Sequence, residues 1–231
     1  MAADELTALR NQVRELSADV GALQDVHAVR KLQHAYGYYL DKCLYDEVVD
    51  LFAASGEVRF MGGAFKGTAG LRRLYCDRFR RNFTGGHNGP IYGFLLDHLQ
   101  LQDIVDVTPG RERAYGRFRC FMQAGVHETK KDAPPMLPSQ WWEGGIYENE
   151  YVRELGVWKI QVCNYRCLYQ GHYDRGWAHA APQSGPTFSG TFPTDPLGPD
   201  ILLTPTPVMW PQTDVVAFHY AHPVTGKRWV P

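Results

Sequence analysis

Four long segments in the middle of the chain alternate between polar and apolar residues, and this run constrains the fold more than any other feature. The segments span residues 94–107, 112–124, 140–153 and 157–169. Such alternation is typical of β-strands whose two faces meet different surroundings. The connections VTPGRE and ELGVW are short enough for tight turns. We therefore expect an antiparallel sheet.

Helical segments precede these strands. Residues 5 to about 43 predict one long helix, and residues 45–52 and 68–83 predict two shorter ones, with a short strand at 56–61. Helices first and a run of antiparallel strands afterwards favour an α+β fold over a parallel doubly wound sheet. From about residue 170 the chain is rich in Pro, Gly, Ser and Thr but keeps aromatic residues, so we expect an irregular arm there.

The first part of the long helix carries an apolar seam with the 3-4 spacing of heptad a and d positions. Its members are Leu6, Leu9, Val13, Leu16, Val20 and Leu23. Such a seam fits a self-association helix or a helix that packs on its own domain, and we favour the first. We divide the chain into a helical extension (1–24), a domain (25–177) and an arm (178–231) that packs on the domain or on a neighbouring subunit.

Composition and simple sequence signals narrow the class of ligand and the expected location of the protein. The formal net charge of −1 predicts no broad attraction to nucleic acid or to anionic membranes. The N-terminus lacks the features of a signal peptide, no apolar run reaches membrane-spanning length, and the five cysteines form no C-x-x-C, so we expect a cytoplasmic protein. With 13 Tyr, 11 Phe and 6 Trp, the chain has the aromatic content to line a pocket for a flat organic molecule.

Motifs for common cofactors do not occur in the sequence. The nine histidines form no H-x-H, H-x-x-x-H or carboxylate-linked metal pattern. There is no G-x-G-x-x-G or P-loop for a nucleotide, and no G-x-S-x-G for acyl transfer. We therefore expect neither a metal nor an organic cofactor.

His98 is the first candidate for chemistry, because it interrupts the apolar strand FLLDHLQLQDIV. By period-2 alternation its face also carries Phe94, Leu96, Gln100, Gln102 and Ile104. This face fits a pocket wall, although spacing alone favours a structural histidine bonded to Asp97 or to a backbone carbonyl. On the long helix Asp41 shares a face with Tyr38 and His34, where it is placed to orient an imidazole or simply to face solvent.

The later strands supply candidate binding residues. Arg117 either points inward, to hold a phenolate or carboxylate, or belongs to an outer ladder of ion pairs. One face of QWWEGGIYENEYVR carries Trp141, Glu143, Gly145, Tyr147, Asn149 and Tyr151. This face suits a pocket wall, with Tyr147 as an acid or hydrogen-bond donor. In the last strand Tyr165 alternates with Asn164, and alternation does not decide which of them faces inward.

Several local patterns in the expected order resemble the SnoaL-like branch of the NTF2-like superfamily. They are YGYYLDKCLYDEVVDLFAASGEVRF, GTAGLRRLY, DHLQLQDIVDV, RAYGRFRCF and YENEYVRELGVWKI. The resemblance covers roughly residues 25 to 177 and implies a cone-shaped α+β barrel. This fold hosts dehydratases, isomerases, cyclases, dioxygenase subunits and non-catalytic binders.

Within this superfamily the sequence is similar to scytalone dehydratases, which remove water without a cofactor. Their helix Asp falls on Asp41, their strand His on His98, and a pocket-facing strand near Tyr147. Two of their tyrosines fall on Leu40 and Phe60 instead. The resemblance implies that Asp41, His98 and Tyr147 are catalytic. Substrate-binding roles are expected for Tyr38, Phe60, Phe94, Arg117, Trp141, Asn149 and Tyr165.

In its length and Pro-rich arm the chain also looks similar to cofactor-independent diarylpropane lyases of bacterial lignin catabolism. That resemblance implies loss of formaldehyde from a diaryl diol to give a stilbene, with a dehydration as the related possibility. The alternatives are a proton shuttle like ketosteroid isomerase and a non-catalytic binder. We expect an aromatic small molecule as the partner and a homo-oligomer, a trimer with a dimer as the alternative.

Overall fold

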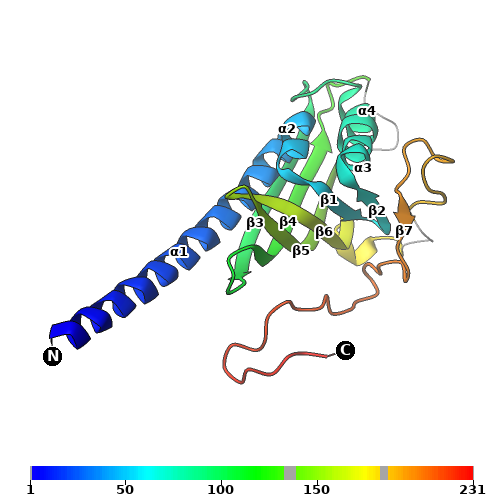
Figure 1. Cartoon of the computed structure of the whole chain (residues 1–231). Helices are drawn as coiled ribbons and strands as arrows, with labels where there is room; N and C mark the ends of the chain where they lie inside the picture. The colour runs from blue at the N-terminus through cyan, green and yellow to red at the C-terminus, as the bar shows by residue number, and fades with distance from the viewer. Residues whose placement is uncertain (1, 133–138, 183–186, 231) are drawn as a thin grey trace.

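The computed structural model of the protein describes residues 2–132, 139–182 and 187–230 (Figure 1). A long helix α1 (Ala2–Asp41) and a short helix α2 (Tyr45–Asp50) come first. The hairpin β1 (Phe52–Phe60) and β2 (Gly63–Lys66) follows, and then the helical segments α3 (Gly67–Arg72), η1 (Arg73–Phe79) and α4 (Arg80–Thr84). The long strands are β3 (Phe94–Val107), β4 (Arg113–Val126), β5 (Gln140–Glu154) and β6 (Val157–His172). The predicted α+β fold is confirmed.

The strands form one curved sheet in the order β3-β4-β5-β6-β1-β2-β7, where β7 (Ile201–Leu202) comes from the arm. All neighbours are antiparallel except β1 and β6, which run parallel. The C-terminal part of α1 lies against β3, and α3 lies against β1 (Figure 1). The hydrophobic core fills the space between these helices and the sheet, with Tyr36, Phe65, Phe118 and Ile160 among its buried members.

A β-bulge divides β3 into two parts. Its pairing with β4 shifts between Leu101 and Ile104, and Gln102 adopts a positive φ of 51°. A bulge turns the following side chains to the other face. Ile104 is therefore 39% exposed, although simple alternation groups it with His98. The predicted inward face is correct as far as Gln100 and wrong beyond it.

The two halves of α1 differ in their surroundings. The six heptad residues between Leu6 and Leu23 are all exposed, by 49–64%. From Asp25 onward the helix is part of the domain: the carboxylate of Asp25 accepts hydrogen bonds from Arg111 (2.5 Å) and from the indole of Trp158 (3.0 Å). Self-association through the exposed half stays a prediction, which light scattering would test.

The segment from α3 to α4 is one continuous helical stretch whose centre, η1, is π-helical. A π-turn adds one residue to a helical turn and changes which side chains share a face. Here it directs Leu74, Tyr75 and Phe79 to the same interior space. The sequence predicted the helix but gave no sign of its π-helical centre.

The C-terminal arm packs on the domain. Phe188 is buried against Phe65, with ring centroids 5.7 Å apart, and β7 pairs with β2. Arg73 binds the arm through the carbonyl of Gly198 (2.8 Å) and the carboxylate of Asp200 (2.6 Å). Within the described ranges, none of the helices has the length and hydrophobicity needed to cross a membrane.

Candidate active site

An aromatic cavity of about 480 Å³ lies between the sheet and the helices. Its walls come from α1, η1, β5 and β6, and the large aromatic residues among them are Tyr36, Tyr75, Phe79, Trp141, Tyr147 and Tyr165. A volume of this size matches pockets that enclose small organic molecules. The polar side chains His98, Glu143, Gln170 and His172 also line it.

His98 enters the cavity from β3 and is joined to Asp41, the last residue of α1. One carboxylate oxygen, Oδ1 of Asp41, accepts hydrogen bonds from the His98 backbone N–H and from its ring Nδ1, each at 2.8 Å. Both side chains are 9% exposed. A carboxylate on Nδ1 fixes the ring orientation and leaves Nε2 as the nitrogen that exchanges a proton. The hydrogen bonds of the described residues leave Nε2 available to a ligand.

The end of α1 places Asp41 beside the strand. The helix stops at Asp41, and the turn that follows is closed by a hydrogen bond from the Cys43 N–H to the Leu40 carbonyl (2.9 Å), with Cys43 at a φ of 54°. The core position of Leu40, 5% exposed, fixes the rotation of the helix about its axis. Asp41, the next residue, therefore faces β3.

Five tyrosines line the cavity: Tyr45 and four others, which are Tyr36, Tyr75, Tyr147 and Tyr165. The hydroxyls of Tyr36 and Tyr75 lie 3.0 Å apart, and the rings of Tyr147 and Tyr165 lie 4.7 Å apart. Burial raises the pKa of all four hydroxyls well above the ordinary value. They therefore stay protonated at neutral pH and serve as hydrogen-bond donors.

Glu143 is a buried carboxylate, 7% exposed, on the cavity wall. Its Oε1 accepts a 2.6 Å hydrogen bond from the Tyr165 hydroxyl, and its Oε2 accepts one from the Gln170 amide. Two donors and no described acceptor suit the ionised carboxylate, which can only accept. Besides burial, the negative charge of Glu143 contributes to the raised pKa of Tyr165 and of Cys167.

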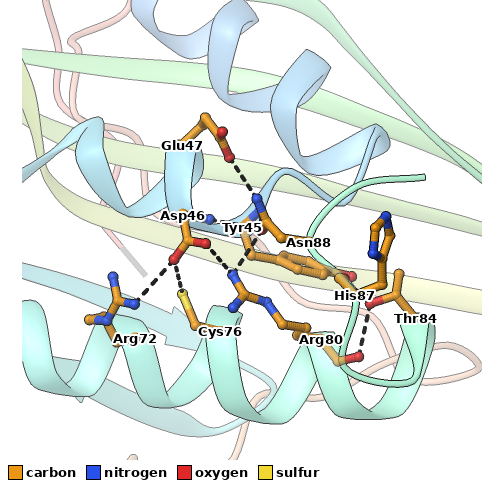
Figure 2. A network of polar contacts seen from close by, with 9 residues as sticks. All are labelled: Tyr45, Asp46, Glu47, Arg72, Cys76, Arg80, Thr84, His87 and Asn88. Atoms are coloured by element: carbon orange, nitrogen blue, oxygen red, sulfur yellow. Dashed lines mark hydrogen bonds and ion pairs between the residues drawn. The ribbon is translucent and has the colours of Figure 1, made fainter. Parts of the chain in front are cut away.

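A polar network fastens the helical segments at one end of the cavity (Figure 2). The Asn88 Oδ1 accepts hydrogen bonds from the backbone N–H groups of Tyr45 (2.8 Å) and Asp46 (3.2 Å), and so caps the start of α2. Arg80 donates to both Asp46 (2.6 Å) and Asn88 (2.8 Å). The network fixes Tyr45 and Phe79, which line the cavity.

A shallower groove lies beside the cavity, between α1 and β3. It is lined by His34, Tyr38 and Asp41, the helical face that the sequence predicted, and by His98. Tyr38 is 74% exposed there and is not on the cavity wall. The His98–Asp41 pair therefore separates the cavity from a groove that opens to solvent.

The structure brings some of the predicted site residues together and places others elsewhere. His98, Tyr147, Phe60, Trp141 and Tyr165 line the cavity, and Asp41 reaches it through His98. The residues outside the cavity wall are Tyr38, Phe94, Arg117 and Asn149.

Each of those other residues has partners of its own. Phe94 stacks on Phe83, which does line the cavity, with centroids 5.8 Å apart. Asn149 is 1% exposed and donates to Gln33 (2.9 Å) within the core. Arg117 belongs to the outer face, where it pairs with Glu148, so the ion-pair alternative describes its position.

Glu143, Tyr36 and Tyr75 are among the cavity residues that were not predicted as site residues from the sequence. Glu143 had a usable signal, because it shares the face of Trp141 and Tyr147 and puts a charge among aromatic and glycine residues. Tyr36 and Leu40 are four residues apart on α1, which places them on one face. Tyr75 belongs to the apolar stripe of the predicted helix 68–83, which indicated an interior position but not a place at the site.

No cluster of three or more His, Cys, Asp or Glu side chains arranged to hold a metal ion occurs within residues 2–132, 139–182 and 187–230. All five cysteines are buried free thiols. The polar groups of the cavity are instead suited to hydrogen bonding and proton transfer with an organic ligand.

The sequence profile of the SnoaL-like domain matches residues 21–164, more than half of the chain. The protein therefore has the α+β fold of this class, and the chain belongs to the SnoaL-like family, as the sequence motifs predicted. A search of curated proteins finds no significant match.

Solved structures share the fold. A candidate scytalone dehydratase from Novosphingobium aromaticivorans DSM 12444 superposes with a TM-score of 0.51 at 16% identity, over 73% of this chain and 96% of that one. The hexachlorocyclohexane dehydrochlorinase LinA type 3 from Novosphingobium barchaimii LL02 superposes with a TM-score of 0.53 at 18% identity, over 71% of this chain and 99% of that one. At such identities the likeness concerns the fold.

Proposed function

We propose that the protein is a cofactor-independent lyase that eliminates a group from a phenolic aromatic molecule by acid–base chemistry. The observation that carries the proposal is the buried His98–Asp41 pair with Nε2 free at an aromatic cavity. Positioned proton transfer of this kind contributes about 10²–10⁴-fold to a rate. Two structures that share the fold are named for eliminations, one a dehydratase and the other a dehydrochlorinase.

The candidate substrate is a lignin-derived diarylpropane diol. Such a molecule carries a benzylic hydroxyl, two aryl groups on neighbouring carbons and a primary alcohol. Loss of water from the benzylic carbon, followed by loss of the primary carbon as formaldehyde, gives a stilbene. The balance is one diol to one stilbene, one formaldehyde and one water, with no net oxidation or reduction. A simple dehydration uses the first half of the same chemistry.

His98 serves both halves. In the first, Nε2 of the imidazolium gives its proton to the departing benzylic hydroxyl while the para phenol gives its own to an acceptor on the cavity wall, and a neutral quinone methide forms. In the second, neutral His98 takes the proton of the primary alcohol. Its C–O bond becomes C=O, the C–C bond breaks, and the electron pair forms the alkene as the ring regains a phenol proton. The carboxylate of Asp41 stabilises the imidazolium that returns.

The tyrosines are positioning donors in this scheme. Because burial raises the pKa of Tyr147 well above its ordinary value, full proton transfer from its hydroxyl is costly. A hydrogen bond to the substrate oxygen costs much less and still stabilises charge that develops there. The aromatic walls hold the rings and exclude water.

The two alternatives receive less support. A non-catalytic binder fits an apolar cavity with Asp41 facing solvent, whereas here Asp41 binds the ring of His98, and His98 and Tyr147 line the same cavity. A ketosteroid-isomerase-like shuttle needs a carboxylate free to take a proton from carbon. Such a shuttle gives no role to the buried His98–Asp41 pair at the cavity.

The test is incubation of the purified protein with a diarylpropane diol that bears para hydroxyls. We expect a stilbene, seen by its absorbance and mass, and an equal amount of trapped formaldehyde, with the rate unchanged by a chelator. Loss of water alone would make the enzyme a dehydratase. No turnover of this diol or of related phenols, or a double-bond shift in a steroid without change of mass, would overturn the proposal.

A further inference from the structure

Four side chains form a row across the inner face of the sheet. His98 on β3 pairs with Met122 on β4, Met122 pairs with Glu143 on β5, and Glu143 pairs with Gln170 on β6. All four line the cavity. Directly paired residues point to the same face, and strands lie about 4.8 Å apart, so His98 and Glu143 stand about 10 Å apart along the sheet. The cavity thus has two polar ends with Met122 between them.

Neighbouring residues fix the position of the Glu143 side chain. The Tyr165 ring covers Gly145, where a Cβ atom would come within 2.5 Å of the ring, so glycine is required for the ring to lie there. From that position the Tyr165 hydroxyl donates to Oε1 of Glu143 at 2.6 Å. Gln170 holds Oε2. These contacts hold the carboxylate in place, and neither of the two donors is a cation.

No Arg, Lys or His among the described residues forms an ion pair with Glu143. A carboxylate has about four lone-pair positions, and the two donors occupy two of them. The remaining lone pairs of Glu143 can accept hydrogen bonds from a ligand in the cavity. The ligand group expected there is therefore a hydrogen-bond donor. An anionic ligand group would be repelled there.

We propose that Glu143 is a substrate-recognising and catalytic residue that binds a para-phenolic hydroxyl of the substrate, about one aromatic ring away from the group that His98 releases. The proposal rests on the proposed function. It assigns the substrate class as phenols with a free hydroxyl at the ring position opposite the reacting carbon. The aromatic walls between the two ends favour a phenol over a flexible aliphatic alcohol.

The proton balance closes with this assignment. As water leaves, the phenol proton moves to the Glu143 carboxylate while His98 gives a proton to the departing hydroxyl. As formaldehyde leaves, His98 takes the alcohol proton and Glu143 returns its proton to the ring oxygen. Both residues end in the state in which they began. Tyr165 keeps its proton throughout, because burial and the neighbouring carboxylate raise its pKa well above the ordinary value.

Binding of unreactive ligands tests the proposal separately from turnover. The probes are a stilbene with a para hydroxyl on each ring, its dimethyl ether, and the analogue with an aminomethyl group in place of each hydroxyl. We expect the wild type to bind the dihydroxystilbene at least about tenfold more tightly than the ether, as for a hydrogen bond to a buried charged group. In Glu143→Gln this preference falls to about threefold or less, because a neutral amide is the weaker acceptor.

Glu150→Gln is the matched control, since it makes the same change on the other face of β5 and should keep the full preference. Circular dichroism and a melting curve establish that each variant is folded. Equal binding of the phenol and its ether by the wild type would overturn the proposal without any variant. Tighter binding of the aminomethyl probe than of the dihydroxystilbene would show that Glu143 selects a cation. That result would overturn the proposal too. If the diol is cleaved but no preference exists, only this proposal fails. If the preference exists without cleavage, the proposed function fails and the proton-transfer role of Glu143 fails with it, while its recognition of the phenol stands.

Discussion

Two histidines of this protein bind a carboxylate in the same way, yet only one lies at a cavity. In each pair one carboxylate oxygen accepts the backbone N–H and the ring Nδ1 of the histidine: His98 with Asp41 at 2.8 and 2.8 Å, and His219 with Glu148 at 3.1 and 2.5 Å. Both histidine side chains are nearly buried, 9% and 8% exposed. Local geometry and burial therefore do not distinguish them.

The surroundings of the two histidines do distinguish them. His98 lines an aromatic cavity and its Nε2 has no hydrogen-bond partner among the described residues, whereas Nε2 of His219 lies 3.4 Å from Asp106. Glu148 also pairs with Arg117, which donates to the arm carbonyls of Val216 (2.8 Å) and Ala217 (2.6 Å). The outer pair fastens the C-terminal arm to the sheet. We propose that such a histidine–carboxylate pair serves proton transfer or attachment according to what its second nitrogen meets.

Asp41→Asn should have the largest effect on activity. The amide has no charge to stabilise an imidazolium, and its NH₂ group can donate to Nδ1 and place the ring proton on Nε2 instead. We expect turnover of the diol to fall by about 10²–10⁴-fold, measured by stilbene formation. Asp50→Asn, at the exposed end of α2, is the control. Turnover within about threefold of wild type would remove Asp41 from the mechanism, as this loss is far below the range for acid–base catalysis.

Glu148→Ala should act on stability instead. It removes the partner of both Arg117 and His219, whose side chains are only 11% and 8% exposed. Breaking a buried pair on one side leaves the other charge uncompensated, so we expect a loss of about 2–4 kcal/mol in the free energy of unfolding. Urea denaturation measures it, and turnover should stay near wild type. The exposed pair of Glu154 with Lys159 gives the control, for which Glu154→Ala should cost less than about 1 kcal/mol.

Tyr147→Phe tests whether the cavity residue Tyr147 donates a hydrogen bond or transfers a proton. If Tyr147 only donates a hydrogen bond, as its raised pKa indicates, its loss should lower turnover by about tenfold. A loss beyond about a hundredfold would show that Tyr147 transfers a proton itself, since that is the range of acid–base catalysis. Tyr173→Phe, at an exposed position, is the control and should react at the wild-type rate.

Asp25 provides a carboxylate that supports the fold without a histidine. Although burial opposes it, hydrogen bonds from Arg111 and Trp158 lower the pKa of Asp25 below its ordinary value of 3.8. Its contribution to stability is therefore fully present above that value and is lost as the pH falls through the lower, folded-state pKa. In acid denaturation the stability difference between wild type and Asp25→Asn should shrink below about pH 4. A difference that grows with acid would contradict this reading.

Much of the fold was predictable because its signals are local. Period-2 alternation identified 94–107, which is β3 as observed, and it identified β4 to β6 to within about three residues. The β-bulge at Gln102 and the π-helical segment η1 were not predictable, because both depend on how the finished sheet and helices fit together. Each of them changes which side chains face the interior.

The candidate site also has a part that the sequence predicted and a part that it did not. Asp41 and His98 were chosen because the chain resembles a known family, and the structure places them in contact. Arg117 and Tyr165 show the limit of alternation, which says which residues share a face but not which face is inward. Glu143 was visible on the correct face, but its importance depends on its register with His98 across two strands. Register is set by long-range pairing that the sequence does not display.

Turnover of His98→Ala and His219→Ala on the same diarylpropane diol tests the central claim most directly. Both changes remove an imidazole that is bound to a carboxylate, and they differ only in what the second nitrogen meets. We predict that His98→Ala lowers turnover by at least about a hundredfold while His219→Ala stays within about threefold of wild type. Near-normal turnover by His98→Ala, or an equal loss in both variants, would contradict the account.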